Sequence, residues 1–153
     1  MAEEGRAPQS VLFACGLNSI RSPMAAALFR QRFGKTMYVA SAGVRSGEPD
    51  PFAIAVMDEI GLDISKHRPH TFEDLEEWEG LNFDLIVTLS PEAHHKALGL
   101  TRTLAADVEY WATPDPSDAA GNREQVLDAY REVRDQLERR INERFGKTAA
   151  VNE

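Results

Sequence analysis

The residues in this chain that could do chemistry lie in one short segment, Cys15–Pro23 (CGLNSIRSP). Cys15 is the only cysteine among the 153 residues, and five residues separate it from Arg21. A loop of this kind can turn its backbone N–H groups inward, and a helix that follows at once adds the partial positive charge of its N-terminus. The planar guanidinium of Arg21 can bind two oxygens of a phosphate-like group. The segment therefore predicts a cradle for a small oxyanion.

The thiol at the start of this cradle indicates a reaction. The positive field favours the thiolate form of Cys15, which is the nucleophilic form. A thiolate that faces a bound phosphate group can attack phosphorus in line and form a thiophosphate, which water later hydrolyses. We expect Cys15 and Arg21 to be catalytic. The other residues expected to bind substrate are Gly16, Leu17, Asn18, Ser19, Ile20 and Ser22.

This reaction also needs an acid that protonates the leaving oxygen, and a loop late in the chain offers one. In the segment Thr113–Asp118 (TPDPSD), Asp115 stands between Pro114 and Pro116. The two prolines restrict the backbone and so hold the direction of the carboxyl group. Asp115 is the predicted acid, and Asp118 is the competing candidate.

Apolar runs of strand length alternate with helical patterns, and these elements must position the reactive groups. The predicted strands are Ser10–Cys15, Met37–Ser41, Phe83–Leu89 and Leu104–Tyr110. The predicted helices begin at Ser22–Pro23, Pro51, Thr71, Ser90–Pro91 and near Asn122. Gly34 and Gly61 are predicted to end the first two.

Capping and spacing support these helices. Ser22 is the predicted N-cap of the first helix, and Thr71 with Asp74 resembles a capping box. The alternation of strands and helices predicts an α/β fold in which helices cover both faces of a parallel sheet. In such sheets ligands bind beyond the carboxyl ends of the strands, at a switch point. The segment after Cys15 is expected to lie there.

Composition excludes several classes of function. The chain has 17 Lys and Arg against 25 Asp and Glu, a net charge of −8, so we expect no binding to nucleic acid or to anionic membranes. One cysteine can form neither an internal disulfide nor a cysteine-rich zinc site. The sequence contains no run of about 18 apolar residues, so we expect no transmembrane helix. The N-terminal residues are polar, so we expect no signal peptide. The expected compartment is a reducing cytoplasm.

The remaining distinctive side chains are interpreted as structural. His67 and His70 lie three apart and His94 adjoins His95, but no cysteine or carboxylate completes a metal set beside them. We interpret these histidines as surface or capping residues, and we expect no metal and no cofactor. Trp78 and Trp111 are expected to be packing residues. The acidic stretch Glu73–Glu79 is expected to be a solvated helix face.

The segment Cys15–Pro23 resembles the Cys-x5-Arg-Ser loop that follows the first strand of the low-molecular-weight protein tyrosine phosphatases and of the related thioredoxin-type arsenate reductases. The resemblance continues in order along the chain, from Val11 to about Arg140. The other segments that carry it are Ser41–Gly43, Ile64–Arg68, Phe83–Ile86 and Asp115–Pro116.

The resemblance implies a fold and a set of roles. The fold would be a three-layer α/β sandwich with a four-stranded parallel sheet in the order 2-1-3-4, formed by one domain over residues 1–153 with flexible ends at 1–9 and 148–153. Cys15 would be the nucleophile, Arg21 the phosphate clamp and Asp115 the acid and then the base. Asn18 would hold the loop shape, and Ser22 would donate a hydrogen bond to the Cys15 thiolate. The partners would be a phosphorylated protein, with phosphotyrosine as the leading substrate, or a small phosphomonoester. Inorganic phosphate would be product or inhibitor.

Four departures from the family pattern keep alternatives open. Ser117 and Asp118 stand where an aromatic pair usually follows Asp115–Pro116, and Val44–Glu48 also lacks an aromatic residue. Ile20 replaces a second loop cysteine, so no disulfide can protect Cys15. Ser90 stands where a reductase would have a resolving cysteine, which excludes the intramolecular route. The alternatives are an arsenate reductase that uses an external thiol of the glutathione or mycothiol type, and a non-catalytic binder of phosphate or a phosphoprotein.

Overall fold

Four strands form one parallel sheet in the computed structural model, which describes residues 8–152 and their side chains as far as Gly146. The strands are β1 (Ser10–Cys15), β2 (Tyr38–Gly43), β3 (Leu85–Thr88) and β4 (Asp107–Tyr110). Their order across the sheet is β2-β1-β3-β4, and each neighbouring pair is parallel. The predicted sheet and its 2-1-3-4 order are confirmed.

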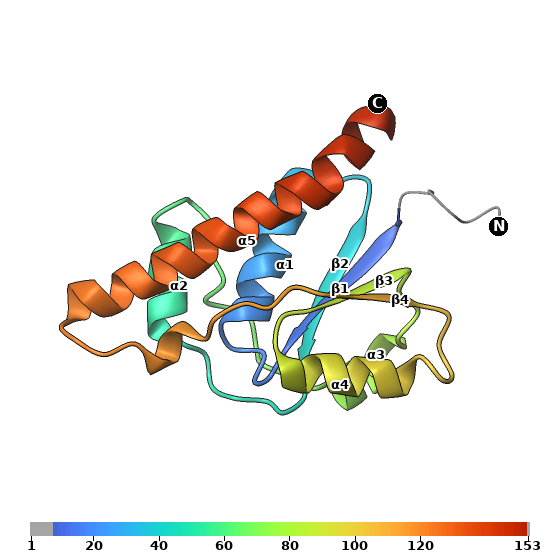
Figure 1. Ribbon diagram of the computed structural model, residues 1–153, viewed down its shortest axis with the longest axis horizontal. Helices are drawn as coiled ribbons and strands as arrows, with labels where there is room; N and C mark the ends of the chain where they lie inside the picture. Colours follow the sequence, from blue (N-terminus) through green and yellow to red (C-terminus); the bar gives the residue numbers. More distant parts are fainter. Residues whose placement is uncertain (1–7, 153) are drawn as a thin grey trace.

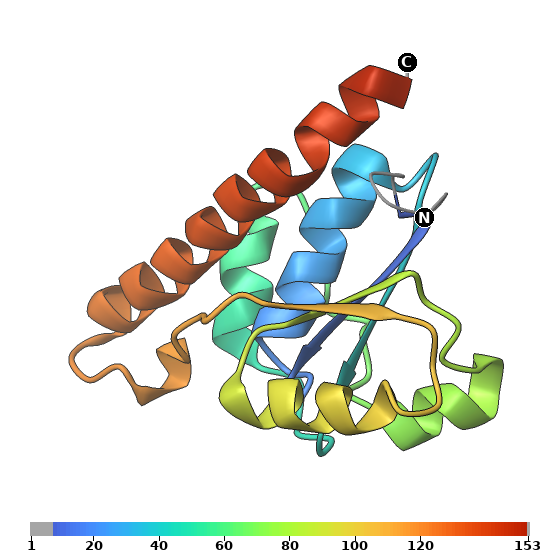
Figure 2. The ribbon, with the colours of Figure 1, turned by 45° about the vertical axis from the view of Figure 1, so that its right-hand side comes forward.

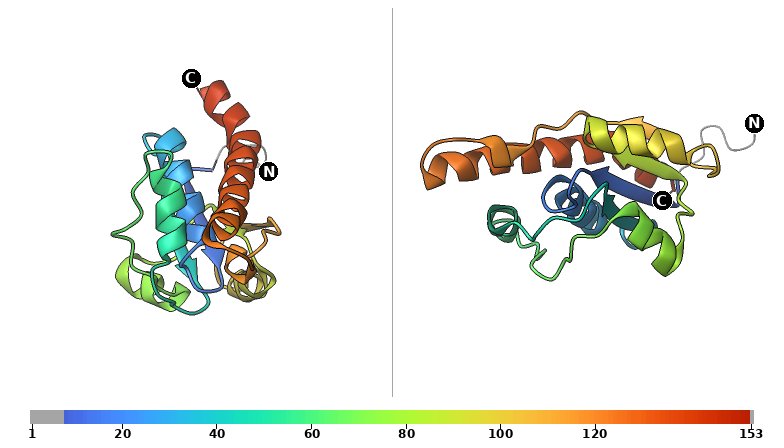
Figure 3. Two further views of the ribbon diagram at one scale, coloured as in Figure 1. Left: turned by 90° about the vertical axis from the view of Figure 1, so that its left-hand side faces the viewer. Right: turned by 90° about the horizontal axis from the view of Figure 1, so that it is seen from below.

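Helices cover both faces of this sheet (Figure 1, Figure 2). The helices are α1 (Arg21–Phe33), α2 (Pro51–Asp58), α3 (Phe72–Glu79), α4 (Pro91–Leu100) and α5 (Arg123–Asn152), with a short 3₁₀ turn, η1, at Pro116–Asp118. Figure 3 shows α5 beside α1 and α2, apart from α3 and α4. The molecule is therefore the predicted three-layer sandwich.

The burial of strand β1 explains why residues 11–15 are all apolar. Alternate side chains of a strand point to opposite faces. Phe13 and Cys15 belong to the core under α1, α2 and α5, whereas Leu12 and Ala14 belong to the core under α3 and α4. Both sets are buried, so every position of β1 from Val11 onward is apolar. Burial on both faces fixes the register of β1 and hence the position of Cys15 at its end.

Several predicted boundaries shift by a few residues. Strand β2 extends to Gly43 because Cys15 pairs with Gly43 at the end of β1. Strands β3 and β4 start later than predicted, and α2 ends at Asp58 rather than at Gly61. Residues 148–152, predicted to be a flexible tail, continue α5, whereas residues 1–7 and 153 lie outside the described part.

Two single-residue predictions are wrong. Helix α1 begins at Arg21 and its N-cap position is Ile20, which makes no side-chain capping hydrogen bond, so Ser22 is not the N-cap. The Ser22 hydroxyl has other partners, described below. Trp78 is 65% exposed rather than packed in the core, because it lies near the end of α3 with one ring edge on His70. Trp111 packs on Phe13 as predicted.

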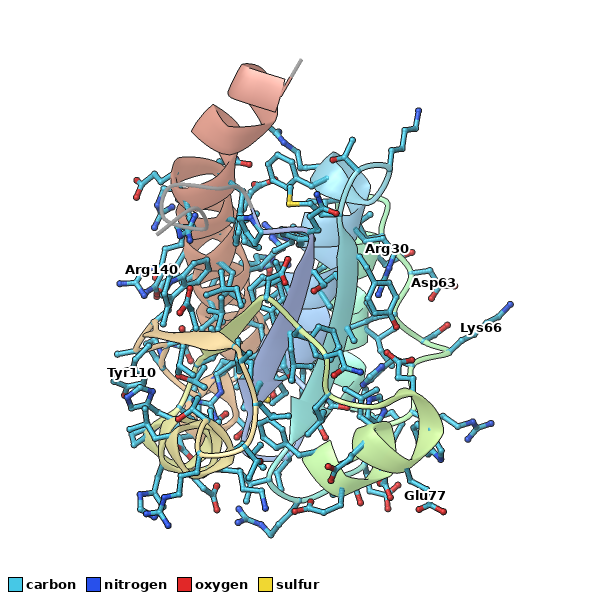
Figure 4. All side chains as sticks on the ribbon, turned by 90° about the vertical axis from the view of Figure 1, so that its right-hand side faces the viewer. Arg30, Asp63, Lys66, Glu77, Tyr110 and Arg140 are labelled. Carbon is cyan, nitrogen blue, oxygen red and sulfur yellow. The ribbon has the colours of Figure 1, made fainter. Side chains whose placement is uncertain are left out.

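The capping box is confirmed, with Thr71 and Asp74 each accepting from the backbone N–H of the other. The connector between α2 and α3 leads to this cap along the β2 side of the sheet. In Figure 4 its labelled residues Asp63 and Lys66 point away from the body, and Tyr110 lies at the opposite, β4 edge. Among the described helices, none combines the length and apolarity that a bilayer crossing needs.

Candidate active site

The reactive residues meet at the carboxyl edge of the sheet. Strand β1 ends at Cys15, residues 16–20 form a loop, and α1 begins at Arg21. The strand order places the switch point between β1 and β3. Because all four strands are parallel, the loops that follow β2 and β4 lie at this same edge. In Figure 2 the arrowheads of β1 and β2 point toward the starts of α1 and α4. The ligand edge predicted from the sequence is therefore where Cys15 and Arg21 lie.

The loop turns at Asn18, which is fully buried and has a φ of 57°. It is the only non-glycine residue of the described part with a positive φ. Asparagine tolerates this left-handed conformation better than most residues because its short amide forms local hydrogen bonds. The Asn18 side chain bonds to Ser22, to Ser41 and to the backbone of His70. Asn18 therefore shapes the loop from inside the protein.

The hydrogen bonds of Asn18 leave the hydroxyl proton of Ser22 available to Cys15. The backbone N–H of His70 donates to Asn18 Oδ1 over 3.0 Å, so the other amide atom, Nδ2, is the donor. This Nδ2 donates to Ser22 Oγ over 2.8 Å and to Ser41 Oγ over 3.0 Å. Since Ser22 Oγ accepts from Asn18, its own proton is free for Cys15 Sγ, which lies 2.9 Å away. The geometry supports a hydroxyl that donates to a thiolate.

Replacing Ser22 by alanine should lower the reactivity of the Cys15 thiol toward electrophiles without disturbing the fold. A hydrogen bond to a charged group is worth about 1.5–3 kcal/mol, which corresponds to roughly a 10- to 100-fold loss of reactivity for the sulfur. The rate at which iodoacetamide alkylates the only thiol measures this directly. Ser22→Thr, which keeps the hydroxyl, is the matched control. An alkylation rate in Ser22→Ala within about twofold of the wild type would show that the hydroxyl does not donate to sulfur.

Two histidines support the loop from behind. His67 Nε2 lies 2.9 Å from Asn18 Oδ1 and 3.1 Å from the Asn18 carbonyl oxygen. Both oxygens only accept, so this nitrogen carries the hydrogen. His70 Nε2 lies 2.6 Å from the carbonyl oxygen of Ser41. These side chains are partly buried, and the interpretation as surface or capping residues is corrected. Their spacing alone gave no sign of this role.

The burial of His67 makes the stability of the protein depend on pH. Burial disfavours the charged imidazole and so lowers its pKa below the usual 6.5. Below about pH 6.5 the unfolded chain binds a proton at His67 that the folded chain does not. We therefore expect the free energy of unfolding to fall as the pH drops below about 6.5. Above that pH the His67 imidazole is neutral in both the folded and the unfolded chain, and this loss of stability is absent. Urea unfolding at about pH 7.5 and about pH 5.5 measures this. His67→Gln keeps an N–H donor without titrating, so its stability should change less with pH. An equal change in both proteins would contradict the assignment.

Arg21 joins the loop to the acid predicted from the sequence. Its Nη1 donates to the carbonyl oxygen of Thr113 over 3.0 Å, and its Nη2 lies 3.8 Å from Asp115 Oδ2. Asp115 Oδ1 accepts from the backbone N–H and the hydroxyl of Ser117, over 2.9 and 2.7 Å. One carboxylate oxygen is thus held by the turn, and the other faces the arginine. Asp118 lies in the same turn with its side chain exposed.

The structure places Asp115 beside Arg21, and Arg21 begins the helix at the far end of the loop that follows Cys15. Of the other predicted binding residues, Ser19 and Ile20 are largely buried and Leu17 is 44% exposed. Gly43 is a further requirement, since a Cβ there would lie 2.9 Å from the Asn18 backbone nitrogen. Across the described residues, no three His, Cys, Asp or Glu side chains gather as metal ligands.

Comparison with known proteins gives one family. Residues 10–152 match the model of the family described as low molecular weight phosphotyrosine protein phosphatase. Among curated relatives, an arsenate reductase of Bacillus subtilis (strain 168) is 33% identical over 139 residues, which cover 90% of this chain and 95% of the relative.

The similar solved structures include a tyrosine phosphatase and an arsenate reductase. A low molecular weight protein tyrosine phosphatase from T. tengcongensis superposes with a TM-score of 0.73 at 26% identity, covering 91% of this chain and 99% of that protein. An arsenate reductase in a phosphate-binding state superposes with a TM-score of 0.68 at 27% identity, covering 91% and 98%. The fold is thus shared with proteins of both names, a tyrosine phosphatase and an arsenate reductase.

Proposed function

Because the chain belongs to the low molecular weight phosphotyrosine protein phosphatase family, we propose that it hydrolyses phosphomonoesters through a thiophosphate on Cys15. The observation that carries this proposal is the 2.9 Å contact between Cys15 Sγ and a Ser22 hydroxyl whose oxygen already accepts from Asn18. Such a donor stabilises a thiolate without needing a neighbouring base. The leading substrate is phosphotyrosine in proteins. A thiolate enzyme needs a reducing compartment, and we propose the cytoplasm.

The first step transfers the phosphoryl group to sulfur. The Cys15 thiolate attacks phosphorus, the bond from phosphorus to the ester oxygen breaks, and Asp115 gives its proton to that oxygen as the alcohol leaves. Arg21 neutralises the charge on the equatorial oxygens, which a planar two-pronged donor can bind together. Loop N–H groups and the N-terminus of α1 add to this stabilisation. The products are the alcohol and a thiophosphate.

The second step restores the enzyme. Asp115, now ionised, takes a proton from water as the water oxygen attacks phosphorus. The bond between phosphorus and sulfur breaks, and the electron pair returns to Cys15 as thiolate, which the Ser22 hydroxyl stabilises again. Inorganic phosphate leaves. The cycle needs no metal and no reductant.

A rate comparison tests this function. Phosphotyrosine, phosphoserine and an alkyl phosphate are supplied to the wild-type chain at one pH, and released phosphate is measured, with Cys15→Ser as the blank. We expect the aryl ester to be hydrolysed fastest because its leaving group is the best. Tight binding of a phosphopeptide without phosphate release would contradict catalysis and favour a non-catalytic binder. A comparable rate on all three esters would contradict the preference for phosphotyrosine.

Reduction of arsenate is a second candidate function, favoured by the 33% identical relatives that are named arsenate reductases. Cys15 is the only cysteine, and Ser90 is the N-cap of α4, so a reductase would need an external thiol. The Cys15 thiolate would attack arsenic and form a bond between sulfur and arsenic, while one arsenate oxygen takes up protons and leaves as water. A first external thiol would then attack the Cys15 sulfur, releasing arsenite and leaving a mixed disulfide. A second thiol would release Cys15, so two thiols are oxidised for each arsenate reduced.

The two functions differ in their reductant. An assay with arsenate, glutathione or mycothiol, and a coupled NADPH-dependent reductase detects arsenate reduction as NADPH consumption. Phosphatase activity predicts phosphate release without any thiol and no NADPH consumption above the Cys15→Ser blank. NADPH consumption together with no hydrolysis of an aryl phosphate would replace the first proposal by the second.

A further inference from the structure

An ion pair lies beside the phosphate loop and takes no part in the steps above. Arg45 follows β2, and Glu92 lies in the first turn of α4. Both Arg45 terminal nitrogens bond to the Glu92 carboxylate, Nη1 to Oε2 and Nη2 to Oε1 over 3.2 Å. Both side chains are exposed. The pair therefore joins two separate elements at the surface of the ligand edge.

Backbone contacts hold this pair directly against the loop. The Arg45 N–H donates to the carbonyl oxygen of Gly16 over 2.9 Å, and the Val44 N–H donates to that of Cys15 over 3.1 Å. Glu92 Oε1 lies 3.0 Å from the place where a Cβ on Gly16 would stand. Glycine at this position leaves room for the carboxylate. A negative and a positive side chain thus meet one residue after the nucleophile.

The charges of this pair act in opposite directions on an anionic ligand. Glu92 alone would repel an anion next to the loop, and Arg45 alone would attract one. Paired side by side, the two charges largely cancel at a distance of several ångströms. We propose that Arg45 and Glu92 are opposed specificity residues: Glu92 disfavours, and Arg45 favours, a substrate with a second anionic group beside its phosphate. This inference rests on the proposed function, and it assigns to the pair the choice among phosphorylated substrates.

The alternative is that the pair is only a strap between the β2 loop and α4. A strap is lost in the same way whichever partner is removed, so Arg45→Gln and Glu92→Gln would then change activity in the same direction. Opposed specificity residues predict opposite directions. The sign of the two effects therefore distinguishes recognition from mechanical support.

The experiment compares two phosphotyrosine peptides of equal length, one with glutamate and one with glutamine beside the phosphotyrosine. We expect Glu92→Gln to raise the preference for the acidic peptide, measured as the ratio of kcat/KM values, by about 3- to 10-fold. Arg45→Gln should lower that ratio by a similar factor. The double variant should return to within about twofold of the wild type, and high salt should shrink each effect. Lys96→Gln is the matched control, because Lys96 of α4 also pairs across elements, with Glu73 of α3.

A binding measurement keeps this inference separate from the proposed function. Two ligands are titrated into Cys15→Ser and into Cys15→Ser combined with Arg45→Gln or with Glu92→Gln. The ligands are inorganic phosphate and pyrophosphate, which carries a second anionic group. The ratio of their dissociation constants should move in the same opposed directions without any turnover. If neither peptide is hydrolysed but the ratio moves, the function fails and the assignment of the pair stands. If both variants shift either ratio in one direction, or in none, the assignment is wrong.

Discussion

Replacing Cys15 by serine should reduce the hydrolysis of an aryl phosphate on the order of 10⁴-fold or more, because the nucleophile is removed from a reaction that has no second route. A hydroxyl in this position is not ionised at neutral pH, and the hydrogen bond from Ser22 that suits a thiolate cannot by itself ionise it. The chain has no other cysteine that could replace Cys15. The loss should fall on kcat.

The same variant should still bind phosphate. The backbone of the loop is held by contacts that do not involve the sulfur, including the Asn18 hydrogen bonds to Ser41 and His70. Calorimetric titration with phosphate and thermal unfolding therefore serve as controls for folding. In the wild type, rapid acid quenching during turnover should trap phosphate on Cys15, and mass spectrometry should locate it there. Turnover by Cys15→Ser above a few per cent of the wild-type rate, with contamination excluded, would refute the thiophosphate route.

Much of the fold could be predicted because its determinants are local in the sequence. The run Ser10–Cys15 is apolar at each position from Val11 onward, which only a strand buried on two faces requires. Asp50 and Ser90 each precede a proline and cap a helix, and Thr71 forms its capping box with Asp74. Each of these signals lies within a few residues of the element it sets. Boundaries such as the end of β2 depend on a partner strand, so the sequence placed them less well.

The same distinction separates the parts of the site. The spacing of Cys15 and Arg21 and the prolines around Asp115 are visible in the sequence, and the fold places Asp115 beside Arg21. The hydrogen-bonding role of Ser22 was suggested only by resemblance, while its position as an N-cap was the local expectation. That expectation is wrong because helix α1 already begins at Arg21, and the Ser22 hydroxyl bonds to Asn18 and Cys15 instead. Both partners precede Ser22, by four and seven residues, whereas an N-cap side chain accepts from backbone N–H groups that follow it.

The support behind the loop could not be predicted because its partners lie far apart in the chain. His67 reaches Asn18 across 49 residues, and Arg45 reaches Glu92 across 47. Neither pair has a spacing that distinguishes it from surface residues in a connector or on a helix. Trp78 shows the reverse error, since its size favoured the core but its position at the end of α3 leaves it exposed. Contacts between side chains that are far apart in the sequence are therefore the part of the site that only the structure reveals.

Replacing Asp115 by asparagine should slow poor leaving groups far more than good ones. Asp115 Oδ1 accepts two hydrogen bonds from Ser117, so Oδ2, which faces Arg21, is the oxygen left to carry the transferred proton. Asparagine can keep the bonds at Oδ1 but has no proton to give. General acid catalysis contributes about 10²- to 10⁴-fold, and an alkyl phosphate should lose that much. 4-Nitrophenyl phosphate, whose leaving group departs as a stable anion, should lose about tenfold or less.

Asp118→Asn is the matched control, because Asp118 lies in the same turn and was the competing candidate for the acid. Single-turnover rates of thiophosphate formation on the two esters, compared among the wild type and both variants, separate the alternatives. With Asp115 as the acid, Asp118→Asn should stay within about twofold of the wild type on both substrates. If the strong dependence on leaving group appears in Asp118→Asn and not in Asp115→Asn, the acid is Asp118, and the contact between Asp115 and Arg21 serves to hold the arginine in place.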